Sequence, residues 1–296
     1  MQTLRRRLYV IVARCFALVI RMLPYRTAVA VGGVLGAAAF RVIKKSRTIV
    51  ERHLKEAFPE KEYDEIYRIA RTSFINQGKN AFELFSFPNL TSSKLREIVH
   101  IENKIAFEQA LAPGKGVLIA SAHCGNWEIM GAALADAGFP INVIARKIYL
   151  DGLNQLLVDF RESKKMHVIL RSDPGAAKQM LRALRNNGSI AMLIDQDTSV
   201  QGVFVDFFGR PAWTPSGLAS LAFKTGAAVI IALDVRQPDD SHCVVLSGPF
   251  WFEKTSDTEK DIMDATSFLT HLIENHIRQN PEQWVWMHER WKTQPQ

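Results

Sequence analysis

A histidine and a glutamate five positions apart are the residues of this chain whose types and spacing best suit catalysis. They are His123 and Glu128, in the segment His-Cys-Gly-Asn-Trp-Glu. A carboxylate in contact with an imidazole fixes its tautomer and stabilises the imidazolium, so the pair could remove a proton from a substrate hydroxyl. A chain with 8 histidines also produces this spacing by chance, and a surface contact near a helix N-terminus explains it equally well.

The segments on either side of the pair give it a place in a fold. The apolar run 116–122 predicts a buried strand, and the small-polar turn after it predicts a helix whose N-cap is Asn126. His123 would then lie at the carboxyl end of a strand, where open α/β sheets bind their ligands. Glu128 would lie in the first helical turn, from which its carboxylate can reach back to the imidazole.

Two arginines follow in the same part of the chain. Arg146 comes directly after the expected strand 141–145, and Arg161 lies on the expected helix 153–163. A guanidinium offers bidentate donors that suit either a developing oxyanion or a phosphate group. Either arginine could therefore assist catalysis or bind substrate, although most single arginines are surface residues.

Two aspartates, Asp195 and Asp197, follow the apolar run 190–194. Carboxylates at a strand end could bind a metal, bind sugar hydroxyls or cap the next turn. A metal site needs more ligands at suitable spacing, and the sequence offers none that is convincing. The sequence therefore predicts no metal.

Four sequence blocks together carry a resemblance. They are the segment His123–Glu128, the arginine-containing segment 144–161, the segment 195–215 that begins Asp-Gln-Asp, and the closing segment 281–292. In this order they resemble the bacterial lipid A late (lauroyl and myristoyl) acyltransferases and their phosphatidylinositol mannoside acyltransferase relatives, within the HX4(D/E) glycerolipid acyltransferase superfamily. The likeness covers essentially the whole chain. Glu289 departs from it, because the family often has a basic residue there.

The resemblance implies a membrane-associated O-acyltransferase that needs no cofactor. It would move a fatty acyl group from a thioester, on acyl carrier protein or coenzyme A, to a hydroxyl of a phosphorylated glycolipid, expected to be a lipid A precursor. His123 would act as the base, Glu128 would orient it, and Arg161 would stabilise the oxyanion, without a covalent acyl-enzyme. The residues expected to contact substrate are Arg146, Asn126, Asp195, Asp197 and Phe207.

Other interpretations stay open beside this one. The acceptor could be a phosphatidylinositol mannoside or another lysophospholipid or glycolipid. The same His–Glu pair could activate water, which would make the protein a thioesterase. Cys124 could act as a nucleophile, although sequence neighbours rarely form a thiolate–imidazole pair and a small buried cysteine is the simpler interpretation. A non-catalytic basic protein that binds membranes or nucleic acid would use neither residue.

Composition limits the class of protein. The chain has 296 residues, a net charge of +7 and 47% hydrophobic residues, which together indicate a globular protein that favours anionic partners. Anionic partners include an anionic membrane surface, an acidic carrier protein and phosphorylated lipid. No helix-turn-helix or RNA-binding motif indicates nucleic acid. An odd count of 3 cysteines without a C-x-x-C motif argues against a disulfide scaffold or a zinc ribbon.

The N-terminus predicts membrane association. The apolar run 8–23 carries Arg14 and Arg21, and with Arg7 these form a seven-residue repeat that places cations along one edge of a helix. Such a helix can lie in a bilayer interface, at the cytoplasmic face of the inner membrane. A second apolar run, 27–40, is shorter than the roughly 20 residues that span a bilayer. A helical hairpin packed on the core is the alternative for both runs.

The order of apolar runs predicts an α/β fold with a mostly parallel or mixed central sheet flanked by helices. Residues 1–43 would form the membrane-associating helices, 44–92 a helical cap, and 93–296 the acyltransferase core. The closing segment adds tryptophans and basic residues that could anchor in a bilayer or pack in the core. The strands are expected at 117–122, 141–145, 168–170, 190–194, 229–235 and 244–246.

Overall fold

The computed structural model describes residues 2–295, with side chains described for residues 9–295. Its centre is a seven-stranded sheet in the order β1-β9-β8-β2-β5-β3-β4, in which only the β8–β9 pair is antiparallel. The strands are β1 (Val99–Glu102), β2 (Val117–Ser121), β3 (Ile141–Ala145), β4 (His167–Leu170), β5 (Ser189–Leu193), β8 (Ala228–Arg236) and β9 (His242–Phe250). This confirms the predicted fold class and every expected strand.

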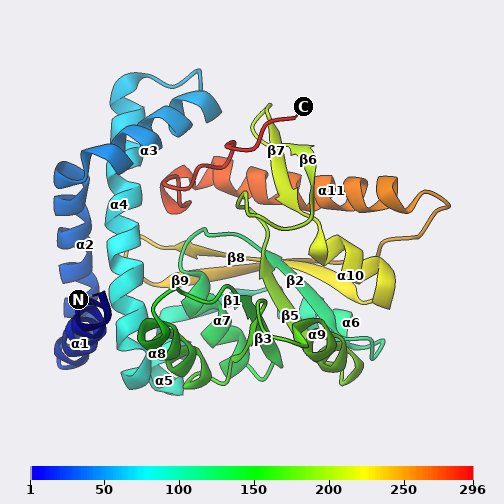
Figure 1. The fold of residues 1–296 in the computed structure, drawn as a ribbon, viewed down its shortest axis with the longest axis horizontal. Coiled ribbons are helices and arrows are strands. Elements are labelled where there is room, and N and C mark those ends of the chain that lie inside the picture. The colour runs from blue at the N-terminus through cyan, green and yellow to red at the C-terminus, as the bar shows by residue number, and fades with distance from the viewer. Residues whose placement is uncertain (1, 296) are drawn as a thin grey trace.

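Helices connect and cover these strands (Figure 1). Those before β2 are α1 (Gln2–Arg21), α2 (Tyr25–Val42), α3 (Lys44–Ala57), α4 (Tyr63–Ser86), α5 (Ser92–Ile98) and α6 (Lys104–Leu111). Those after it are α7 (Trp127–Asp136), α8 (Asp151–Glu162), α9 (Ala176–Arg185), α10 (Gly217–Thr225) and α11 (Thr258–Gln279). Three strands that the sequence analysis missed are β1 and the two strands of a hairpin, β6 (Gly202–Asp206) and β7 (Pro211–Pro215).

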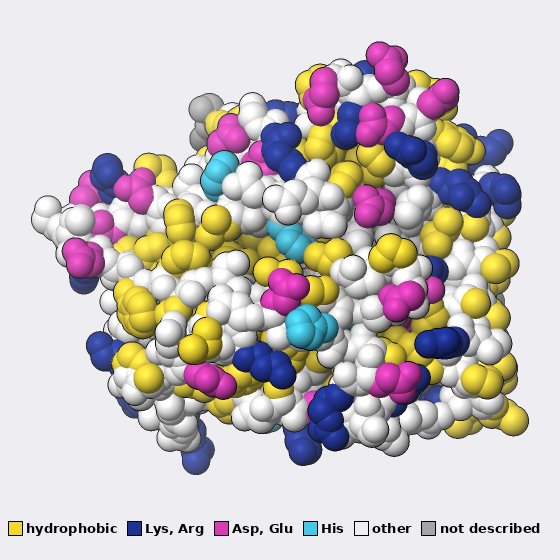
Figure 2. Space-filling model, turned by 180° about the vertical axis from the view of Figure 1, so that it is seen from behind, with side chains coloured by type: hydrophobic (Ala, Val, Ile, Leu, Met, Phe, Trp, Pro, Cys, Tyr) yellow, Lys and Arg dark blue, Asp and Glu magenta, His cyan; other side chains and the backbone are white. Residues whose placement is uncertain are grey.

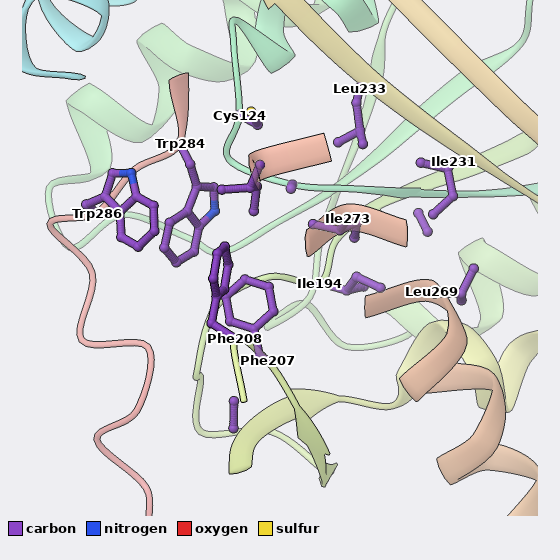
Figure 3. Packing of buried hydrophobic residues seen from close by; sticks show 14 of the residues in the cluster. Cys124, Ile194, Phe207, Phe208, Ile231, Leu233, Leu269, Ile273, Trp284 and Trp286 are labelled. Carbon is purple, nitrogen blue, oxygen red and sulfur yellow. The ribbon is translucent and has the colours of Figure 1, made fainter. Parts of the chain in front are cut away.

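The two faces of the sheet bury different helices because side chains alternate along each strand. In β2, Val117 and Ile119 pack in the cluster that contains α5 to α8, whereas Leu118 and Ala120 pack in the cluster that contains α9 to α11. The second cluster also holds the closing tryptophans, which lie against Phe207 and Phe208 (Figure 3). Because the central strands are buried on both faces, we expect the polar side chains of a functional site at the carboxyl ends of these strands.

The second N-terminal helix, α2, packs on α4 through glycines. A Cβ on Gly32 would lie 2.6 Å from the carbonyl oxygen of Gly78, and a Cβ on Gly36 would lie 2.3 Å from that of Phe74. Backbone therefore touches backbone where α2 lies alongside α4. Within the described residues no single helix passes a length-and-hydropathy test for crossing a bilayer, and only the pair α2–α3, bent by 90°, passes it jointly.

Candidate active site

The turn after β2 carries His123, and its geometry follows from its sequence. Asn126 is the N-cap of α7, as predicted, and its Oδ1 accepts hydrogen bonds from the backbone N–H groups of Glu128 and Ile129 at 3.2 and 3.1 Å. Gly125 has a φ of +58°, and a Cβ there would lie 2.2 Å from the carbonyl oxygen of Asp234. Only glycine fits this position, so the turn places His123 at the carboxyl end of β2.

The carboxylate that holds His123 is Asp195. Its Oδ1 lies 2.9 Å from Nδ1 of the imidazole, and its Oδ2 accepts from the His123 backbone N–H at 2.9 Å. Trp284 donates its indole N–H to the same Oδ2 at 2.7 Å. With Nδ1–H donated to an ionised Asp195, the Nε2 lone pair of His123 is free to accept a proton.

Electrostatics keeps Asp195 ionised although it is buried. Burial by itself raises the pKa of a carboxyl, but the neighbouring His123 and the hydrogen bonds from His123 and Trp284 hold the pKa of Asp195 below its usual value. The His123 side chain is 23% exposed, so a substrate can reach it. The pair therefore has the arrangement of the base and the orienting carboxylate of a hydrolase triad.

The expected contact between Glu128 and His123 is wrong. Glu128 instead forms a two-pronged ion pair with Arg161 on α8, with Nε to Oε2 at 2.9 Å and Nη2 to Oε1 at 2.6 Å. Among the described side chains, the only carboxylate within ion-pair distance of His123 is that of Asp195. The side chain of Glu128 points toward the next helix, α8, whereas Asp195 follows directly after β5, the strand that pairs with β2.

The Glu128–Arg161 pair lies at an apolar cavity. Burial lowers the pKa of a guanidinium, but the hydrogen bonds and charge of Glu128 outweigh it and raise the pKa of Arg161. The cavity measures about 540 Å³ when the open solvent at its mouth is included, and the centre of a water-sized molecule can reach about 60 Å³ of it. Trp127, whose ring lies 4.9 Å from that of His123, also lines it. The remaining lining residues, almost all of them apolar, are Ile119, Ser121, Met130, Gly131, Leu134, Ile141, Val143, Ile144, Met166, Ala191 and Leu193.

Three further residues predicted to contact substrate, Arg146, Asp197 and Phe207, do not line the apolar cavity. Arg146 is exposed after β3. Asp197 is buried and holds the closing segment, since its Oδ2 accepts from the Thr293 N–H at 2.9 Å. Phe207 is fully buried in the core beside Trp284, at 5.5 Å between ring centroids, and does not line the apolar cavity.

Cys124 and the tryptophans of the closing segment are buried in the core. Cys124 is buried, and its burial raises the pKa of the thiol well above the usual value, with Asp234 and Asp195 adding to that effect. A thiol that stays protonated is a poor nucleophile. Trp284, Trp286 and Trp291 are buried as well, which favours the core over bilayer anchoring for this segment.

Sequence reasoning missed Trp284 and the pairing role of Asp195. Asp195 and His123 are 72 residues apart in the chain, but both follow buried apolar runs. Since β2 and β5 are parallel neighbours, their carboxyl ends meet, and that was the available signal. Trp284 offered no signal beyond its place in the closing block.

Comparison with known proteins gives one consistent result. Residues 2–293 match the family described as "Bacterial lipid A biosynthesis acyltransferase". The chain is 28% identical over 227 residues to the "Phosphatidylinositol mannoside acyltransferase" of Mycobacterium tuberculosis (strain CDC 1551 / Oshkosh), covering 74% of this chain and 69% of that protein. It is 26% identical over 282 residues to the "Lipid A biosynthesis lauroyltransferase" of Escherichia coli (strain K12), covering 93% and 88%. It is 24% identical to the "Lipid A biosynthesis palmitoleoyltransferase" of the same organism, covering 92% and 87%.

Proposed function

Because this chain belongs to the bacterial lipid A biosynthesis acyltransferase family, and is therefore an acyltransferase that acts on glycolipids, we propose the following reaction for it. The enzyme moves a fatty acyl group from an acyl thioester to a hydroxyl of a phosphorylated glycolipid, with a lipid A precursor as the acceptor. The observation that carries this proposal is the His123–Asp195 pair beside an apolar cavity. A base for a hydroxyl and a pocket for a hydrocarbon chain are the two features that such a transfer requires.

The proposed mechanism uses direct attack. Nε2 of His123 takes the proton of the acceptor hydroxyl as its oxygen attacks the thioester carbonyl carbon. Asp195 stabilises the imidazolium that forms. The carbon–sulfur bond then breaks, and the thiolate leaves with the proton from the imidazolium. Nη1 of Arg161, which is not used in the ion pair with Glu128, is the proposed donor to the oxyanion.

One experiment tests this function against its alternatives. Purified protein is given a panel of thioesters on acyl carrier protein and coenzyme A, with lipid extracts from an organism that makes lipid A and from one that does not. We expect a new ester on a lipid A precursor. An ester formed only on inositol mannosides would move the proposal to that acceptor, and release of free fatty acid without any ester would indicate a thioesterase.

We propose that the apolar cavity holds the acyl chain. Glu128, Gly131 and Leu134 are three residues apart on α7, so they follow one another along the same side of the cavity. Gly131 matters most, because a Cβ at this position would lie 2.6 Å from Sδ of Met166 on the opposite wall. Any larger side chain at position 131 must therefore shorten the cavity or displace Met166.

Substitutions at these two facing positions should shift chain-length preference in opposite directions. Gly131→Val should favour thioesters with shorter chains, and Met166→Ala should favour longer ones. One methylene in an apolar pocket changes specificity by about 10-fold or more. The measurement is kcat/KM for a series of acyl thioesters. An unchanged preference in both variants would place the chain in another part of the protein.

We propose that the outer faces of α1 and α2 bind the cytoplasmic surface of the inner membrane. The two helices lie along one edge of the molecule (Figure 1), and apolar side chains are visible along that edge in Figure 2. The exposed large apolar residues there are Tyr9, Ile11, Val12, Phe16, Leu18, Val19, Met22, Val31, Val34, Leu35 and Val42. Exposed cations accompany them at Arg14, Arg26, Arg41, Lys44 and Lys45. An apolar face with cations beside it suits an anionic bilayer surface.

The predicted cationic edge of α1 is only partly formed. Arg14 is exposed, Arg7 lies outside the described side chains, and the Arg21 guanidinium lies over the ring of Phe160 at 5.1 Å. Arg21 therefore packs against α8 instead of facing outward. Arg14 and the cations of α2 and α3 remain for contact with lipid headgroups.

Placing two carboxylates in this apolar face should weaken membrane binding. We expect Leu18→Asp with Val34→Asp to reduce co-sedimentation with vesicles of anionic lipid, because each buried apolar side chain contributes about 2 kcal/mol. Ile105→Asp on α6 is the control, since Ile105 is as exposed as Leu18, at 58%, but lies on a helix outside this face. Binding that stays at the wild-type level in the double variant would show that another surface attaches the protein.

A further inference from the structure

A cluster of buried polar side chains lies directly behind the turn that carries His123. We call it the rear cluster, and it contains Asn80 and Glu83 of α4, Asp234 and Arg236 of β8, and His242 of β9. The side chains of Glu83, Asp234 and His242 are 0% exposed. Burying several charged groups is costly unless they are paired and hydrogen-bonded, so such a cluster calls for an explanation.

The rear cluster binds the peptide groups of the turn itself. Asp234 Oδ2 accepts from the Asn126 backbone N–H at 2.6 Å, and Asn80 Nδ2 donates to the Gly125 carbonyl at 2.6 Å. Glu83 Oε2 accepts from Asn126 Nδ2, also at 2.6 Å. Because Asn126 caps α7, Glu83 is connected through one side chain to the start of the helix that carries Glu128.

The turn is thus held from both sides of β2. In the sheet, β2 lies between β5 and β8. Asp195, just beyond β5, binds the imidazole and the backbone N–H of His123, while Asp234 on β8 binds the next part of the same turn. The closing segment completes the enclosure, since the Gly125 N–H donates to the Gln283 carbonyl at 3.0 Å. A turn fixed at so many polar atoms has little freedom to move.

The charges within the rear cluster compensate one another. His242 contacts Asp234 Oδ2 through Nδ1 at 2.8 Å and Glu83 Oε1 through Nε2 at 3.2 Å. Burial lowers the pKa of an imidazole, but these two carboxylates raise the pKa of His242 to about 9, so it is a cation at neutral pH. Arg236 also binds Glu83 through Nη1 and Nη2. Two cations and two carboxylates therefore share the site, with Tyr25 donating to Glu83 at 2.7 Å.

We infer that Glu83, Asp234 and His242 are positioning residues for the acyl transfer, which fix the turn so that His123 keeps its reactive geometry and Glu128 keeps its ion pair with Arg161. They act through the turn and do not touch the proposed substrates. The inference rests on the proposed function. Its physical basis is that a displacement of about 1 Å at reacting groups can lower the rate about 10²-fold.

Glu83→Gln tests this role, with Tyr25→Phe as its matched control. Gln keeps the size of Glu83 but replaces the carboxylate that binds Asn126, Arg236 and His242. Tyr25→Phe removes a hydrogen bond to the same carboxylate without touching the turn. We expect kcat per folded molecule to fall about 10²-fold in Glu83→Gln, with KM unchanged for donor and acceptor. In Tyr25→Phe both constants should stay at the wild-type level.

Two results separate positioning from simple stability. A lower melting temperature for Glu83→Gln with unchanged kcat per folded molecule would overturn the inference. If Glu83→Gln does not fold, His242→Gln is used instead, since it removes the cation that holds the carboxylates of Asp234 and Glu83 against the turn and should lower kcat, though less than Glu83→Gln. An unchanged kcat in a folded His242→Gln would overturn the assignment equally. The proposed function is tested separately in the same assay, by whether the wild-type protein transfers the acyl group to the glycolipid.

Discussion

His123→Ala should fold like the wild type and lose nearly all acyl transfer. The imidazole is the group that takes the proton of the acceptor hydroxyl, and general-base catalysis contributes about 10²–10⁴ to the rate. The fold should survive because the backbone of residue 123 keeps its bonds to Asp195 Oδ2 and to the Val285 N–H. The measurement is kcat/KM for transfer, with circular dichroism to show the folded state.

The matched control is His100→Ala, which removes an exposed histidine from β1. This variant should transfer acyl groups at the wild-type rate. A transfer rate for His123→Ala within the range of the control would show that His123 is not the general base.

Asp195→Asn should lower kcat for acyl transfer almost as much as His123→Ala does. Asn can still accept from the His123 backbone N–H and from Trp284, but it does not supply a negative charge beside the imidazolium. Its amide can also donate to Nδ1, which would leave the proton on Nε2 and block that atom as a base. In a serine-protease triad the equivalent change lowers kcat about 10⁴-fold.

The contrast with Glu128→Gln makes this prediction specific. Glu128 contacts Arg161 and not the imidazole, so its loss should act on the oxyanion donor and on the cavity opening. If Asp195→Asn transferred at the wild-type rate while Glu128→Gln lost all transfer, the pairing seen in the structure would not be the one used in the reaction.

Apolar runs predicted the sheet well because strands buried on both faces leave an unmistakable pattern. The runs at 117–122 and 190–194 became β2 and β5, and His123 lies at a strand end as expected. β1 (Val-His-Ile-Glu) and the strands of the β6–β7 hairpin (Gly-Val-Phe-Val-Asp and Pro-Ala-Trp-Thr-Pro) were missed, because polar residues, glycine or proline interrupt or bound their few apolar residues. Length is not the reason, since β3 and β4 are equally short and were predicted.

The site was harder to predict than the fold because its contacts join distant parts of the chain. Nearness in sequence suggested Glu128 as the partner of His123, but a residue in the first turn of a helix can point away from the preceding strand end. Asp195 reaches the imidazole because β5 pairs with β2, and that pairing depends on the strand order. The order of strands in a sheet cannot be predicted from the residues of any one segment.

The interpretation of Phe207 shows the same limit. Aromatic residues in a block shared with acyltransferases suggested a wall for the acyl chain, yet Phe207 packs in the core against Trp291 and Trp284. The cavity has Gly131 in its wall instead, at a point where the Met166 sulfur lies too close for any side chain to fit unless Met166 moves. A residue that lines a cavity by being small leaves little trace in a sequence pattern.

Direct transfer between the two substrates is the central claim, and one measurement tests it most directly. Enzyme, thioester and lipid A precursor are mixed in equal amounts, quenched during a single turnover, and analysed by intact-protein mass spectrometry together with lipid and thiol quantification. We predict that each thiol released is matched by one new ester on the glycolipid, and that no acyl group is attached to the protein at any time. Accumulation of an acyl adduct on Cys124, or thiol release matched by free fatty acid with the glycolipid unchanged, would contradict the account.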